Sequence, residues 1–427
     1  MRQLTIPAAV LTALLVPAAS HAAKPWNAPE TVSRAPGIPS VAIGPDKRAV
    51  VAWSANNAAY GARRTPSRGF GEPFAFHKQR SAVGDATVAF DAAGNALFGF
   101  RRLIERNHRI AGATLRQRGS RTGPISLSGS GSSAYDPTFA APAAGTLAAR
   151  PTLTWWRRNN SAGLPPTRVQ LARAVGGRLL ASENDTIPNT SGARYAQAPD
   201  GAVVAATTTS NSIVVAVRPP GASFAAPLTL DAGRGRFRDA DVSLGRDGTV
   251  AVIWRRFTGS TYRLFASVLR AQGAFGAPVA VSGADERADK PRVLVTSAGA
   301  VRIAYLSTPP GNDRGSQAGR LRMVSLDGRP ETVTAGSQRA IEYELAGDGR
   351  GGATLAWTRR TGNSFGGAVY ARAVTPSGRL GARQQLTRRG ETARGMSLAV
   401  GTDGDAVLAW LTADARRLRA ARRPASG

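Results

Sequence analysis

The chain has 427 residues and a formal charge of +29, because 56 Lys and Arg residues stand against only 27 Asp and Glu. Hydrophobic residues make up 42% of the chain, which is enough to bury a sizeable interior. Cysteine is absent, which excludes disulfides and a lipoprotein anchor on cysteine. The shortage of acidic residues favours polyanionic partners.

The N-terminal segment has the features of a signal peptide. Arg2 precedes an apolar run from Leu4 to Pro17, and small residues continue to Ala22. The run is too short for a spanning helix, and no later segment approaches the ~20 apolar residues that a membrane span needs. We therefore expect residues 1–22 to be a signal peptide and residues 23–427 to form a single domain. The protein should be secreted, either extracellular or associated with the cell wall.

A strand–turn–strand unit then repeats along the chain. Its clearest copy, residues 244–256, reads as strand, Asp-Gly turn, apolar strand, tryptophan and two arginines. A turn glycine with an aromatic residue six positions later recurs, and Lys47 stands at the glycine position before Trp53. The copies that carry a glycine are Gly94 with Phe100, Gly248 with Trp254, Gly299 with Tyr305, Gly351 with Trp357, and Gly404 with Trp410. The seven steps from Trp53 to Trp410 give a mean period of about 51 residues, which is typical of propellers and solenoids.

Each unit contains four strand candidates separated by turn residues. The third unit carries an insertion, so its aromatic residue is Trp155 or Trp156, and the fourth unit has Thr207 at this position. Repetition in one register indicates that the aromatic residues pack between neighbouring units. The expected inner strands are 40–44, 86–91, 138–141, 194–197, 239–245, 292–296, 342–346 and 396–401.

The strands expected at the two ends of the chain complement each other. The last unit lacks a fourth strand, whereas residues 26–33 match the outer strand 275–282 in the positions of Ala, Pro, Val and Ser. We predict that the N-terminal strand completes the last blade, which would remove the open edges of a linear array. The predicted fold is all-β, an eight-bladed β-propeller of four-stranded blades, with seven blades as the alternative.

These repeats resemble the secreted β-propellers of high-GC bacteria whose repeats carry Asp-Gly and Trp, and more distantly WD-repeat and sialidase-type propellers. The resemblance covers nearly the whole chain after residue 22. It implies an architecture and no activity, because this fold hosts binding scaffolds, lectins and hydrolases alike. The aspartate box of sialidases does not occur between third and fourth strands, so no catalytic residue is carried over.

Arginine pairs follow the second-strand aromatic residue in four units. Guanidinium groups bind phosphate, sulfate and carboxylate in a bidentate manner, so these pairs predict a ligand-binding arginine face. Acids at the start of the inner strands, Asp85, Asp136 and Asp239, lie on the same face, and their pairing with the arginines is the alternative interpretation. The predicted ligand-binding residues are Arg101, Arg102, Arg157, Arg158, Arg255, Arg256, Arg359 and Arg360.

Other chemistry is sparse. Beyond the signal peptide the sequence has only His77 and His108, in different units, so neither a histidine metal site nor a Ser-His-Asp triad is expected. No metal or cofactor is predicted, and the Asp-Gly dipeptides are interpreted as hairpin turns. Glu342, Tyr343 and Glu344 form the one inner-strand cluster that suits glycosidic chemistry, although strand alternation puts Tyr343 on the opposite face from the two glutamates.

Two classes of function follow. We expect a secreted, monomeric, non-enzymatic binding or scaffold protein with no catalytic residues. Its basic face would engage a protein partner or a polyanion, such as teichoic acid, an acidic glycan, or nucleic acid without sequence preference. The alternative is a glycan-active hydrolase or lyase with sialidase-like propeller architecture.

Overall fold

The structure is a computed structural model. It describes residues 24–129, 133–158, 168–180, 183–184, 192–270, 273–310, 318–326, 328, 330–360 and 366–425. The expected signal peptide lies outside the described residues.

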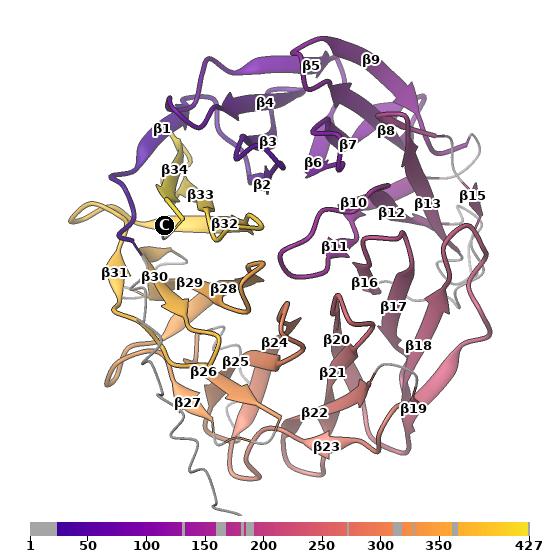
Figure 1. Cartoon of the computed structure of the whole chain (residues 1–427), viewed down its shortest axis with the longest axis vertical. Helices are drawn as coiled ribbons and strands as arrows, with labels where there is room; N and C mark the ends of the chain where they lie inside the picture. The colour runs from indigo at the N-terminus through magenta and orange to yellow at the C-terminus, as the bar shows by residue number, and fades with distance from the viewer. Residues whose placement is uncertain are drawn as a thin grey trace, which may run out of the picture.

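Antiparallel sheets are arranged in a ring around a central opening (Figure 1). The first strand of each sheet lies nearest the opening and the last strand lies at the periphery (Figure 1). Since side chains on a strand alternate between the two faces, each sheet can bury both faces against its two neighbours. The chain is therefore all-β and propeller-like. Within the described ranges no helix is long and apolar enough to cross a membrane.

The strands belong to the following sheets. The first contains β2 (Ser40–Ile43), β3 (Ala49–Ala55), β4 (Ala58–Arg64) and β5 (Phe74–Lys78), and the second β6 (Val83–Phe90), β7 (Ala96–Ile104), β8 (Asn107–Leu115) and β9 (Arg121–Ser126). The third contains β10 (Ser133–Phe139), β12 (Thr152–Arg158), β13 (Arg168–Val175), β14 (Arg178–Leu179) and β15 (Glu183–Asn184). The fourth contains β11 (Ala141–Pro142), β16 (Arg194–Gln197), β17 (Val203–Thr208), β18 (Ser212–Arg218) and β19 (Leu228–Ala232). The fifth contains β20 (Phe237–Leu244), β21 (Val250–Phe257), β22 (Tyr262–Leu269) and β23 (Val279–Ala280), and the sixth β24 (Arg287–Val295), β25 (Val301–Thr308), β26 (Arg320–Ser325) and β27 (Glu331–Thr332).

The remaining strands are β28 (Ala340–Gly347), β29 (Ala353–Arg360), β30 (Gly367–Val374) and β31 (Gln384–Gln385), followed by β32 (Ala393–Val400), β33 (Ala406–Thr412), β34 (Leu418–Arg423) and β1 (Glu30–Ser33). A single residue pair, Gly367 with Ala393, links β30 to β32 and so joins these two groups of strands into one hydrogen-bonded sheet.

The N-terminal strand pairs with the C-terminal strand, as predicted. Glu30 lies opposite Ala420 in the antiparallel pair β1–β34. The N–H of Asn27 also donates to the carbonyl of Arg422 at 2.7 Å. Figure 1 shows the indigo strand β1 beside the yellow strand β34. This pairing covers the edge that β34 would otherwise expose.

The repeated aromatic residue packs between neighbouring sheets. Trp254 is fully buried and shares a core cluster with Ala196 and Val204 of the preceding sheet. In the third sheet Trp155 takes the core position at 2% exposure, whereas Trp156 is half-buried. Replacing one such ring by alanine removes about 3–5 kcal/mol of stability in typical cores. The predicted packing role of these aromatic residues is therefore confirmed.

The hairpin between the first and second strands contains one left-handed residue. Gly248 has φ +80°, and Lys47, at the equivalent position of the first sheet, has φ +61°. The side chain of Asp247 accepts a hydrogen bond from the N–H of Thr249 at 3.0 Å. The Asp-Gly pattern is thus explained by backbone geometry, because aspartate caps the turn and glycine tolerates the positive φ.

Candidate functional site

Six inner strands, β6, β10, β20, β24, β28 and β32, carry a β-bulge near their start, at one end of the central channel that we call the mouth. The register between β6 and β7 shifts after Gly84, and that between β20 and β21 shifts after Arg238. The predicted rim acids lie at such bulges and have positive φ, namely +55° at Asp85, +51° at Asp136 and +50° at Asp239. Bulges redirect side chains, and here they place the three acids at the mouth.

Several of the predicted arginines are paired with acids at this end. The Arg101 Nε lies 2.5 Å from a carboxylate oxygen of Asp85. The buried Arg255 forms ion pairs with both Asp239 and Asp289. These contacts support the alternative interpretation for Arg101 and Arg255, in which part of the arginine pattern is internal pairing.

The other predicted arginines have varied surroundings. Arg256 lies 2.9 Å from Asp231, Arg102 donates to the Ser126 hydroxyl at 2.6 Å, and the Arg359 guanidinium lies 5.4 Å from the Tyr370 ring centroid. Arg157 is half-buried, Arg360 is exposed, and the side chain of Arg158 lies outside the described residues. Of the predicted arginines with described side chains, Arg255 lines the mouth pocket. A ligand-binding role for the arginine face stays a prediction.

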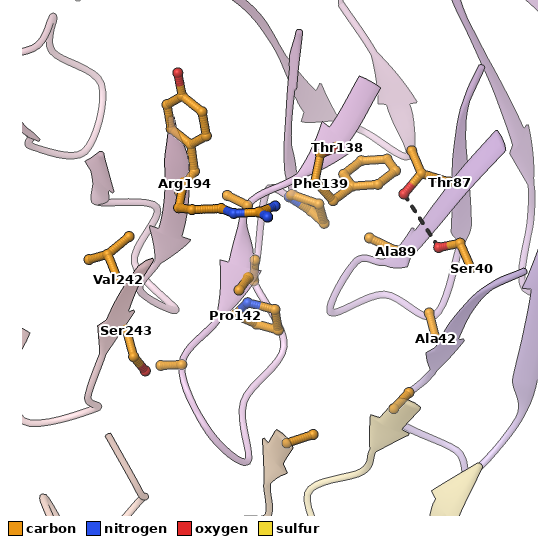
Figure 2. Close-up of a pocket in the computed structure, with 18 of the residues that line it drawn as sticks. Ser40, Ala42, Thr87, Ala89, Thr138, Phe139, Pro142, Arg194, Val242 and Ser243 are labelled. Atoms are coloured by element: carbon orange, nitrogen blue, oxygen red, sulfur yellow. Dashed lines mark hydrogen bonds between the residues drawn. The ribbon is translucent and has the colours of Figure 1, made fainter. Parts of the chain in front are cut away.

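Two adjoining cavities occupy the channel and its mouth. The channel cavity has a volume of about 690 Å³ and the mouth pocket about 730 Å³. Arg194, Arg292 and Glu344 line both of them. Figure 2 shows the Arg194 side chain reaching into the channel cavity from β16 toward Thr138 and Phe139 of β10. Cavities of several hundred Å³ with convergent polar groups are the usual setting of ligand sites.

A loop projects into the opposite end of the channel. Residues 141–148, which belong to the insertion in the third unit, line the channel cavity, and Figure 1 shows the segment at β11 projecting into the central opening. The loop is anchored where β11 pairs with β16, Ala141 lying opposite Ala196. At its tip, Gly145 comes so close to Gly349 in the β28–β29 hairpin that a Cβ on Gly145 would lie 2.0 Å from the Gly349 Cα. We call residues 141–148 the floor loop, because it lies at the end of the channel opposite the mouth.

One equivalent position on every inner strand faces the channel at the same level. Each of these residues pairs with the residue that directly precedes the repeated aromatic position of the second strand, as Asp241 pairs with Ile253 before Trp254. The equivalent residues are Ser40, Thr87, Thr138, Arg194, Asp241, Arg292, Glu344 and Ser397. They divide into an arc of hydroxyl side chains and an arc of charged side chains, which makes the channel asymmetric.

The charged arc alternates in sign around four consecutive inner strands. Arg194 of β16 is exposed to the cavity, and it is followed by Asp241 of β20, Arg292 of β24 and Glu344 of β28, all three half-buried. The N–H of Val293 donates to the Asp241 carboxylate at 2.9 Å and so fixes its position. Alternation allows each charge to be stabilised by its neighbours, and Arg194, Arg292 and Glu344 also line the mouth pocket.

Burial sets the protonation behaviour of the two acids in this arc. It raises the pKa of Glu344, against the opposing attraction of Arg292 and Arg194. Burial likewise raises the pKa of Asp241, and Arg292 and the Val293 hydrogen bond oppose the shift. A carboxyl group whose pKa lies above its ordinary value can exchange a proton nearer to neutral pH, which suits general acid or base chemistry.

The hydroxyl arc lies on the other side of the channel and is tied to the backbone. The Ser40 hydroxyl accepts a hydrogen bond from Val88 N–H at 3.2 Å and lies 3.4 Å from the Thr87 hydroxyl (Figure 2). The Ser397 hydroxyl accepts from Val41 N–H at 3.0 Å in the same manner. These bonds cross from one sheet to the next, so this arc joins sheets, and Ser40, Thr87 and Thr138 line the channel cavity.

The cluster of Glu342, Tyr343 and Glu344 is divided by the structure. The Tyr343 ring is 5% exposed within a core cluster, and its hydroxyl lies 2.7 Å from the carbonyl of Ala304, to which it donates. Glu342 accepts a hydrogen bond from the Thr358 hydroxyl at 3.2 Å, and burial raises its pKa. The expected separation of Tyr343 from the glutamates is observed, and Glu344 is the member of the cluster that joins the charged arc.

Sequence reasoning missed Arg194, Asp241 and Arg292. Each lies 13 positions before the repeated aromatic position of its unit, as Glu344 does before Trp357. Aligning the units on this spacing would have revealed the alternation of charge, but nothing in the sequence marks this column as the one that faces the channel. Within the described ranges, no group of three or more His, Asp or Glu side chains could hold a metal ion.

Neither a protein-family model nor a curated protein matches the sequence. Solved structures with a similar arrangement include an ulvan lyase of polysaccharide lyase family PL25, with 9% identity and a TM-score of 0.49 over 94% of each chain. The polysaccharide lyase Uly1 has 11% identity and a TM-score of 0.49 over 81% of this chain and 91% of its own. Prolyl oligopeptidase B from Galerina marginata has 10% identity and a TM-score of 0.46 over 92% of this chain and 56% of its own. At these values the likeness assigns no role to any residue of this chain.

The expectation of a non-enzymatic binding or scaffold protein is wrong by these findings, and so is the expectation that the chain is not an enzyme. Polysaccharide lyases are among the structures that align over most of both chains. The comparisons favour the alternative interpretation, a glycan-active enzyme. The physical reason for the error is that the catalytic candidates are assembled from four separate strands, so no local motif in the sequence carries them.

Proposed function

We propose that the protein is an extracellular glycan-active enzyme that cleaves an acidic polysaccharide at the mouth of its central channel. The observation that carries the proposal is the charged arc, in which two arginines alternate with two carboxyl groups of raised pKa at the cavity they share. The similar lyases belong to the same class of chemistry, and the ulvan lyase is described as bound to a glycan that contains glucuronate and sulfated rhamnose.

The arrangement suits β-elimination at a uronate residue. The guanidinium groups of Arg194 and Arg292 would pair with the uronate carboxylate and stabilise the charge that develops when the neighbouring C5–H bond breaks. Ionised Glu344 would accept the C5 proton. The electrons of that bond form the C4–C5 double bond as the C4–O bond breaks, and protonated Asp241 would supply the proton to the departing oxygen.

Hydrolysis is the second candidate, because the arc also supplies two carboxyl groups. One would act as the acid on the glycosidic oxygen and the other as the base or nucleophile. The presence of two arginines between and beside the carboxyl groups favours elimination, since a hydrolase does not need to neutralise a substrate carboxylate.

Other features of the chain fit an exported enzyme with a polyanionic substrate. The +29 charge and the arginine face would raise the local concentration of an acidic glycan and speed its encounter with the mouth. The N-terminal residues 1–22 would direct export. The recurrence of the channel-facing position on the inner strands supports a propeller of eight blades, with β1 completing the blade that begins with β32.

The proposal is tested by incubating the protein with glucuronate- and iduronate-containing polysaccharides and with neutral glycans. Elimination produces an unsaturated uronate that absorbs in the ultraviolet, whereas hydrolysis produces reducing ends without this absorbance. Glu344→Gln should lower kcat by about 10²–10⁴, the range for loss of a general acid or base. Arg194→Gln should mainly raise KM.

Arg246→Gln is the matched control, because Arg246 is exposed in the β20–β21 hairpin at the floor end of the ring. It should behave as the parent does. Cleavage of acidic glycans that survives Glu344→Gln unchanged would remove the charged arc from the reaction, and the absence of any cleavage across the panel would refute the proposed activity.

A further inference from the structure

Trp156 differs from the residues at the equivalent position of the other repeat units. It lies near the end of β12, directly after the core residue Trp155, and it lines the channel cavity together with Thr138 and Arg194. None of the residues directly after the repeated aromatic position in the other seven units is aromatic. They are Ser54, Arg101, Thr208, Arg255, Leu306, Thr358 and Leu411. All seven tryptophans are described, and Trp156 is the one that is not buried.

The indole is held in a fixed orientation by its neighbours. Its Nε1 donates to the Asp136 carboxylate at 2.6 Å. Its ring stacks on Tyr135 with centroids 4.6 Å apart and an interplanar angle of 23°. Tyr135 in turn contacts His108, at 5.0 Å between centroids, and carries the Arg101 guanidinium 5.7 Å from its ring centroid. The hydrogen bond to Asp136 and the stacking on Tyr135 hold the Trp156 ring in place, so the ring loses little conformational entropy when a ligand binds.

The side chains around the Trp156 ring favour an amphipathic ligand. A half-buried indole offers an apolar surface, whereas Asp136, Thr138 and Arg194 of the same cavity offer an acceptor, a hydroxyl and a cation. A pyranose ring has the matching properties, because its C–H groups form an apolar face and its hydroxyls point outward. Tryptophan commonly serves such ligands, since it presents a large rigid surface with a polar edge.

We propose that Trp156 forms a stacking subsite for one pyranose ring of the glycan, adjacent to the carboxylate-binding Arg194. This inference rests on the proposed function and deepens it, because it states where the substrate is held outside the charged arc. The sugar on Trp156 would lie on the hydroxyl side of the channel, so a bound chain would cross the mouth from the third sheet toward the charged arc.

Binding can be measured apart from cleavage with a glucuronate-containing oligosaccharide and the Glu344→Gln variant. Because the other six tryptophans are buried, quenching of fluorescence by acrylamide reports mainly on Trp156. The oligosaccharide should protect Trp156 from the quencher. In the same background, Trp156→Leu should weaken the Kd by about three- to tenfold, and Trp156→Phe, which keeps an aromatic face, should stay within about twofold of its parent.

The outcomes separate this inference from the function on which it rests. An oligosaccharide that binds in calorimetry without protecting Trp156, or that binds Trp156→Leu as tightly as its parent, overturns the stacking subsite while cleavage by the parent protein keeps the enzyme proposal. Protection and weakened binding without cleavage of any glycan support the subsite and overturn the enzyme proposal. A panel of acidic oligosaccharides that neither bind nor are cleaved overturns both.

Discussion

The floor loop is held in place by the approach of two glycines, and Gly145→Ala tests this contact. The methyl group would lie 2.0 Å from the Cα and 2.2 Å from the N of Gly349, both backbone atoms, so a side-chain rotation cannot relieve the clash. Gly349 itself donates from its N–H to the carbonyl of Thr402 at 3.0 Å, which ties it to the next hairpin. The floor loop must therefore move away from the β28–β29 hairpin.

The expected loss of stability has two parts. Gly145 has φ +64°, and placing an L-residue in this region costs about 1–2 kcal/mol. Overpacking against fixed atoms costs a further ~1–3 kcal/mol. Gly176→Ala separates the cost of the backbone conformation from the cost of the clash, because Gly176 has a similar φ of +56° and no atom within 4 Å of the position that a Cβ would take. The clash alone should therefore make Gly145→Ala about 1–3 kcal/mol less stable than Gly176→Ala.

Denaturant unfolding gives the stability of both variants, and hydrogen exchange followed by mass spectrometry locates the change. Amides of residues 141–149 should lose protection in Gly145→Ala, while amides of β22 and β23, at the periphery of the ring (Figure 1), should not change. If the two variants unfold at the same denaturant concentration and the loop keeps its protection, the floor loop is not held in place by Gly349.

Three further predictions concern the ring, its core and its charges. Deleting residues 24–33 should expose the edge of β34 and cause aggregation or loss of the cooperative melt, measured by light scattering and calorimetry; an unchanged melt would contradict the role of β1. Trp254→Ala should lower the free energy of unfolding by about 3–5 kcal/mol, because the ring is fully buried, and a loss near zero would show that the ring is not part of the core. Because burial raises the pKa of Glu344 above its ordinary 4.5, its stabilising contribution is complete below pH ~4.5 and is lost as pH rises through the folded-state pKa. In denaturant titrations, Glu344→Gln should therefore gain stability relative to the parent as the pH rises from acidic to neutral. A difference in stability that does not depend on pH would show that the pKa of the Glu344 carboxyl group is not raised in the folded state.

The repeat and the closure of the ring could be predicted because they depend on local patterns. Alternation of apolar and polar residues, a turn that usually contains glycine and an aromatic residue six positions later mark most units, and these features are close together in the chain. The segment containing Trp26 copies an outer strand found elsewhere in the chain, so its pairing with the C-terminal strand followed from comparison within the sequence.

The role of Trp155 and Trp156 depended on the tertiary structure. Both residues suit a strand, and the insertion in the third unit removes the spacing that would distinguish them. The structure places Trp155 between sheets and Trp156 at the cavity because adjacent side chains on a strand point to opposite faces. The insertion itself, interpreted from the sequence only as an irregularity, contains the floor loop that projects into the channel.

The charged arc was decided by the tertiary structure alone. Arg194, Asp241, Arg292 and Glu344 are each about 50 residues from the next in the sequence, and only the closure of sheets into a ring brings them to one level of one cavity. Burial raises the pKa values of Asp241 and Glu344 while Arg292 opposes the shift, and neither the burial nor the neighbouring charge exists in an isolated strand. A repeated sequence thus determines its own architecture through local rules, whereas its chemistry comes from the positions where the repeats differ and from the ring that makes those differences neighbours.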